Sequence, residues 1–173
     1  MTDTPTSSAV TANIPVESFR SALLLMLDET FTGTASPQTF FTDKGSSLIE
    51  TLAGIDAATA SRRFSDRAST IAAQVNHIRF YLDALMEGLQ SGWQPADWPG
   101  SWRMETVTDA EWRDLLDRLV ASYAEVRAFA ETNENWNGEF IGGGIAIVAH
   151  TAYHLGEIRS SLAALQVPER SDV

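Results

Sequence analysis

The strongest constraint on the fold of this chain is an apolar stripe that recurs at helical spacing through residues 71–89. Its members follow one another at steps of four, three, four, three and four residues: Ile71, Val75, Ile78, Leu82, Leu85 and Leu89. Such steps place side chains on one face of an α-helix, which has about 3.6 residues per turn. Similar spacing marks three other long segments, and no segment shows a convincing strand pattern. Four amphipathic helices predict an all-α protein built as a four-helix bundle.

Start and stop signals give the predicted helices their approximate ends. The first long helix is expected from about Pro15 to Phe31, because proline suits a first turn. A loop follows, and residues 46–53 predict a short extra helix between the first two long ones. Asp56 is expected to cap one further turn that reaches Ala60.

The other three long helices are expected at residues 70–89, 109–131 and 145–165. Ser69 is predicted to cap the first of these, and Thr108 with Glu111 forms a capping box before the second. The last helix should end before Pro168. The stretch from Gly92 to Met104 is rich in tryptophan and proline and predicts a loop, as do the polar, glycine-bearing residues 133–144.

Length and charge limit the domain organisation and the classes of partner. The chain has 173 residues, which favours one domain at 15–167 between a flexible N-terminal tail at 1–14 and a C-terminal tail at 168–173. Its formal net charge of −11 disfavours nucleic acid and anionic membranes as partners. The absence of cysteine and of a signal-like N-terminal segment favours a cytoplasmic location.

The chemistry of the chain is concentrated in its only three histidines, His77, His150 and His154. His150 and His154 lie four residues apart in the last predicted helix, so they share one face and could bind one ion together. His77 lies beside the apolar stripe of the second long helix and could supply a third ligand. Three histidines with an open fourth position are the arrangement expected of a catalytic metal site.

The residues alone leave other interpretations open. A histidine at the edge of an apolar stripe is often only a hydrogen-bonded residue, and a pair at this spacing also arises by chance. Thr151 stands where a zinc protease of the H-E-x-x-H type has its glutamate, so that mechanism does not fit. Glu157 continues the polar seam of His150 and His154, and we expect it to be an acceptor behind the ligands, a weak further ligand or a proton carrier.

Two sequence segments resemble the DinB/YfiT-like superfamily of four-helix metal proteins. They are Val75-Asn76-His77-Ile78 and the run from Ala149 to Arg159, which contains His150-Thr151-Ala152-Tyr153-His154-Leu155-Gly156-Glu157-Ile158. The resemblance extends from about residue 16 to 165 and implies an up-down-down-up bundle. It also implies that His77, His150 and His154 are the metal ligands. Many members have glutamine where this chain has Glu157.

The resemblance further implies a function and its cofactors. Members include transferases and isomerases that use mycothiol, bacillithiol or glutathione, and others described as metal-dependent hydrolases. Many members form homodimers, so we expect a homodimer here too. We therefore expect a divalent metal, zinc or nickel first and manganese, cobalt or iron next, that activates a low-molecular-weight thiol toward a small electrophilic substrate. The alternatives are a hydrolase that uses metal-activated water, and a non-enzymatic binding module of a stress response.

Two further groups of residues carry open expectations. Arg79 and Arg159 could pair with carboxylates of a thiol cofactor, although both also suit a solvated helix face. The tryptophans of the Gly92–Met104 loop could cover a pocket above the metal. Anchoring of that loop to the bundle is the expectation we favour for them.

Overall fold

The computed structural model describes residues 13–35 and 39–165, and over these residues the chain is helical, with no strand. The helices follow in this order: α1 (Val16–Phe31), α2 (Leu48–Leu52), α3 (Ala57–Ala60), α4 (Ile71–Ser91), the 3-10 helix η1 (Pro99–Trp102), α5 (Asp109–Thr132) and α6 (Gly138–Ala164). The prediction of an all-α protein with four long helices and a short helix between the first two is confirmed. Most of the two predicted tails lies outside the described residues.

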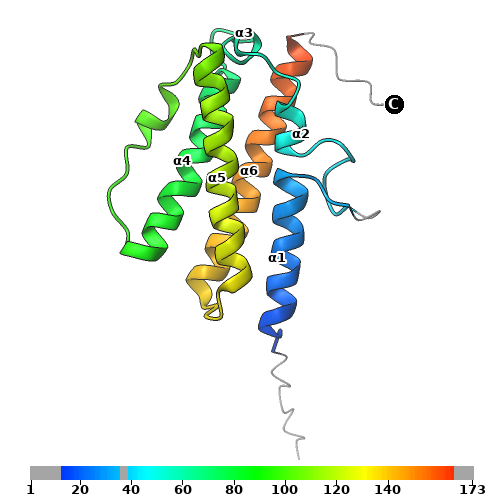
Figure 1. The fold of residues 1–173 in the computed structure, drawn as a ribbon, viewed down its shortest axis with the longest axis vertical. Helices are drawn as coiled ribbons and strands as arrows, with labels where there is room; N and C mark the ends of the chain where they lie inside the picture. The colour runs from blue at the N-terminus through cyan, green and yellow to red at the C-terminus, as the bar shows by residue number, and fades with distance from the viewer. Residues whose placement is uncertain (1–12, 36–38, 166–173) are drawn as a thin grey trace, which may run out of the picture.

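The four long helices α1, α4, α5 and α6 pack side by side along one common direction (Figure 1). Helix α4 contacts α5 and α6, and helix α1 contacts the same two helices. Helices α4 and α5 run in the same direction, and α1 and α6 run in the opposite direction (Figure 1). The connection that includes η1 must therefore return along the length of the bundle before α5 begins.

Side-chain caps set the starts of most of these helices. Thr108 and Glu111 form the predicted capping box of α5, and Asp56 caps α3 through the backbone N–H of Thr59. The cap predicted for α4 was wrong by one residue. The side chain of Thr70, not that of Ser69, accepts the N–H of Ala73.

Helix α6 begins seven residues earlier than predicted, at Gly138 instead of residue 145. Its glycines predicted a loop, because each glycine costs roughly 1 kcal/mol relative to alanine inside a helix. The side chain of Asn137 accepts the N–H groups of Glu139 and Phe140 and so provides a cap before the glycines. The ring of Phe140 packs beside that of Phe129 on α5, which gives this first turn a tertiary contact.

The core lies between the long helices and contains the apolar stripe of α4. Ile71, Val75, Ile78 and Leu82 are fully buried there, and Leu85 is nearly so. Burial of this stripe is the main source of stability for a helix of this kind. None of the helices that the structure describes combines the length and the apolar character needed to traverse a lipid bilayer.

One buried carboxylate, that of Glu29 at the end of α1, holds the loop that follows the helix. It accepts hydrogen bonds from the backbone N–H groups of Phe40, Phe41 and Thr42, the last two at 2.7 Å. Burial raises the pKa of Glu29, but the hydrogen bonds from these residues outweigh burial and leave the pKa lowered. The residue is therefore a buried anion that ties the loop to the bundle.

Candidate metal centre

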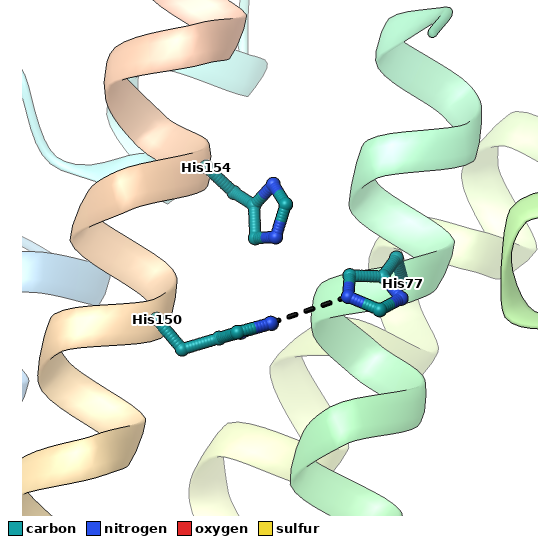
Figure 2. A group of neighbouring side chains, drawn as sticks. All are labelled: His77, His150 and His154. Atoms are coloured by element: carbon teal, nitrogen blue, oxygen red, sulfur yellow. Dashed lines mark hydrogen bonds between the residues drawn. The ribbon is translucent and has the colours of Figure 1, made fainter. Parts of the chain in front are cut away.

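Three histidines from two helices point toward one shared point between α4 and α6 (Figure 2). His77 lies on α4, while His150 and His154 lie one turn apart on α6. One ring nitrogen from each residue lies within 4.8 Å of the other two. Nε2 of His77 lies 3.2 Å from Nε2 of His150.

The local sequence explains why these rings meet. Helices α4 and α6 pack directly against each other, and the small, buried Ala73 lies one turn before His77 on α4. On α6 the spacing of four residues brings His150 and His154 onto the same face. The predicted juxtaposition of one histidine from the second long helix with a pair from the last helix is therefore present in the fold.

Two of the three rings have a partner on the nitrogen that faces away from the shared point. Nδ1 of His77 lies 2.7 Å from the hydroxyl oxygen of the buried Ser101, and Nδ1 of His154 lies 3.3 Å from Oε1 of Gln74. An amide oxygen only accepts, so Nδ1 of His154 carries the proton and its Nε2 has a free lone pair. Nδ1 of His150 is buried and has no hydrogen-bond partner among the described residues.

Aromatic rings enclose the histidines. Trp102 stacks on His77 with ring centroids 4.0 Å apart, and Tyr81 stacks on His150 at 3.8 Å. Trp98 meets the edge of His77 at 6.4 Å. These stacks restrict the rotation of both imidazole rings.

The tryptophans of the 92–104 loop therefore divide between the two expected roles. Trp98 and Trp102 lie against the histidine group, contrary to the expectation we favoured. Trp93 anchors the loop as expected. Its Nε1 donates to Glu139 at 2.7 Å, and its ring occupies the space that a side chain at Gly88 would need.

The electrostatic environment keeps the three rings neutral near pH 7. Burial lowers the pKa of His77. Burial, and secondarily the neighbouring histidine charges, lower the pKa of His150 and that of His154 to about 4. Neutral imidazoles have the free lone pair that a metal ligand requires, so the rings need not release a net proton when an ion binds at neutral pH.

The donor set fits a divalent transition metal. Two imidazole nitrogens bound to one tetrahedral ion at about 2.0–2.1 Å lie roughly 3.3 Å apart, close to the 3.2 Å between His77 and His150. The ligand nitrogens of all three histidines lie within 4.8 Å of one another. The group contains no carboxylate, and an all-imidazole set suits zinc, nickel, copper, cobalt or iron better than magnesium or calcium.

The other predicted site residues lie outside this group. Glu157 is exposed on α6, and its backbone carbonyl accepts the hydroxyl of Ser161. Arg79 pairs with Asp83 and also donates to Asn76, so its charge is engaged within α4. The roles predicted for Glu157 and Arg159 stay predictions.

Sequence reasoning missed Ser101 and Gln74. Gln74 precedes His77 by three residues, so it lies on a neighbouring face of α4, and this spacing is a weak signal for a partner of the site. Ser101 lies in η1, 24 residues after His77, and no sequence pattern marks it. Comparisons with protein-family models, curated proteins and solved structures find no match to this chain.

Proposed function

We propose that this chain is a DinB-like metal protein in which His77, His150 and His154 hold one divalent ion. The observation that carries the proposal is the 3.2 Å separation of Nε2 of His77 and Nε2 of His150, which come from two different helices. The helix directions in Figure 1 are those of the up-down-down-up bundle that the sequence resemblance implies. The neutral state of the three rings and the burial of His77 and His154 support the same assignment.

We further propose that the protein is a thiol-dependent transferase or isomerase acting on a small electrophile. When bound, a divalent ion lowers the pKa of a thiol or of water and so supplies a nucleophile at neutral pH. A free thiol titrates near pH 8.5, far closer to neutrality than water, so it needs less help from a neighbouring base. The histidine group contains no carboxylate that could serve as that base, which favours the thiol over the hydrolase alternative.

The residues around the histidines have definable tasks in such a reaction. His77, His150 and His154 would hold the ion, and the stacked rings of Trp102 and Tyr81 keep two of them in place. The indole rings of Trp98 and Trp102 also shield one side of the group from water. Trp98 is partly exposed, so a substrate with an apolar or aromatic portion could contact it.

Metal content is the first test. The purified protein should bind about one equivalent of zinc or nickel, and His77→Ala, His150→Ala and His154→Ala should each lower the affinity by at least about 100-fold. Ser122→Ala, a substitution of a buried serine on α5, is the matched control and should bind metal normally. Unchanged stoichiometry and affinity in any one histidine variant would remove that residue from the site.

Turnover separates the two enzymatic alternatives. The metal-loaded protein is incubated with an aryl halide or an epoxide, with and without glutathione, mycothiol or bacillithiol. The proposal expects conversion that requires both metal and thiol and is lost in His154→Ala. Metal-dependent hydrolysis of an activated ester without any thiol would instead favour the hydrolase, and metal binding without either activity would favour the non-enzymatic module.

A further inference from the structure

The buried Ser101 makes two hydrogen bonds that together determine which nitrogen of His77 carries a proton. Its hydroxyl oxygen lies 2.7 Å from Nδ1 of His77 and 2.6 Å from the backbone carbonyl oxygen of Trp98. Resting on the metal site proposed above, we infer that Ser101 is a positioning residue that holds His77 as its Nδ1–H tautomer, with the Nε2 lone pair aimed at the shared point.

The assignment follows from counting protons. A carbonyl oxygen only accepts, so the single hydroxyl hydrogen of Ser101 is directed to Trp98. At the other contact the serine oxygen can then only accept, and Nδ1 of His77 must be the donor. A neutral imidazole carries one N–H, which leaves Nε2 of His77 without a proton. That bare nitrogen is the one that lies 3.2 Å from His150.

Hydrogen bonds of the segment around η1 hold Ser101 in this position. The side chain of Asn76, next to His77 on α4, donates to the backbone carbonyl of Ser101 at 2.7 Å. The carboxylate of Asp97 accepts the N–H of Gly100 at 2.9 Å and occupies the space that a side chain at Gly100 would need. Two adjacent residues of α4, Asn76 and His77, thus hold the same loop residue.

The tautomer of His150 can be compared with that of His77. In the metal-free protein Nε2 of His77 accepts, so Nε2 of His150 must donate across the 3.2 Å contact. Within residues 13–35 and 39–165 the Nδ1 atom of His150 has no partner that would oppose this tautomer. Metal loading should therefore move the proton of His150 from Nε2 to Nδ1, whereas His77 should keep its proton on Nδ1.

The test uses full-length protein with nitrogen-15 in its three histidines, since long-range proton–nitrogen spectra distinguish the two tautomers directly. In metal-free wild type at pH 7.5, His77 should show the Nδ1–H pattern and His150 the Nε2–H pattern. Ser101→Ala should shift His77 toward a mixture of tautomers and lower zinc affinity about 10- to 100-fold. Ser101→Thr, which keeps a hydroxyl, should restore both properties.

Two results would overturn the inference: an Nε2–H pattern for His77 in wild type, or an unchanged tautomer and zinc affinity in Ser101→Ala. The wild-type spectrum needs no variant, so the inference stays testable if Ser101→Ala fails to fold. The tautomer readout also needs no metal. A wild-type protein that binds no zinc would defeat the proposed function, while the spectrum would still decide the role of Ser101.

Discussion

The phenol ring of Tyr81 stacks on the imidazole of His150, with centroids 3.8 Å apart and planes inclined by 14°. Among the described residues Nδ1 of His150 has no hydrogen-bond partner, so this stack and the 3.2 Å contact of Nε2 with His77 together fix the ring plane. We expect Tyr81→Leu to weaken zinc binding about 2- to 10-fold, the equivalent of an aromatic pair. Tyr81→Phe keeps the stack and should bind as wild type does. Titration calorimetry measures both, and equal affinities for the two variants would contradict the role given to the stack.

Metal loading should raise the thermal stability of the protein. A ligand that binds only the folded state at 100 times its Kd adds about 2.7 kcal/mol, which is roughly 5–10 °C in Tm for a chain of this size. A variant in which His77, His150 and His154 are all alanine has no histidine left and should show no shift with zinc. Scanning calorimetry with and without a chelator checks this. A similar shift in the variant would mean that zinc binds elsewhere.

Acid should destabilise the metal-free protein through its histidines. The pKa of His150 and that of His154 are lowered from 6.5 to about 4, so between these values the unfolded chain binds more protons than the folded one. Stability is therefore fully present above about pH 6.5 and falls as the pH drops toward 4. Urea unfolding at a series of pH values should show this slope, and the triple alanine variant should lose most of it.

A second acid transition should lie lower and depend on Glu29. Its pKa is lowered below 4.5, so its contribution is present above that pH and is lost as the pH falls below it. Glu29→Gln should cost about 2–4 kcal/mol at pH 7, because an amide cannot accept all the backbone N–H groups that the carboxylate accepts. The exposed Glu125 offers the control, and Glu125→Gln should change the urea midpoint very little. Equal effects of the two substitutions would rule out the anchoring role.

The glycines of α6 give opposite expectations for the same substitution. A side chain at Gly142 would meet nothing within 4 Å, so Gly142→Ala should stabilise the protein by about 0.5–1 kcal/mol through helix propensity. A side chain at Gly144 would come within 2.7 Å of the buried Leu23, so Gly144→Ala should gain less or destabilise. Urea unfolding of both variants measures the difference. A Gly144→Ala variant more stable than Gly142→Ala would contradict the packing described here.

The long helices were predictable from the sequence because periodicity and caps are local signals. The α4 stripe and the Thr108–Glu111 box both lie within one segment, and both are present in the structure. The start of α6 was not predictable in the same way. Glycine propensity points to a loop there, and the contacts that oppose it, such as Phe140 with Phe129, join two helices.

In the candidate site, too, the contacts that follow from local spacing were predictable and the contacts between distant segments were not. The pairing of His150 with His154 follows from helix geometry alone, and their meeting with His77 needed only the packing of two amphipathic helices. The contacts of Ser101 and Trp102 depend on the path of the connection between α4 and α5, which carries η1. No spacing rule relates this connection to α4, so these contacts emerge only when the chain is folded.

Because α4 and α5 run in the same direction, the segment that connects them must span the length of the bundle, and this constrains its number of residues. An ordinary hairpin turn would tolerate insertions, since lengthening a flexible loop costs little. Here the segment spans the bundle and delivers Ser101 and Trp102 to His77 on the way. An insertion or deletion in this segment would displace both residues from His77. Among related chains, length variation should therefore fall in the turn before α6 and after α1, and spare residues 92–108.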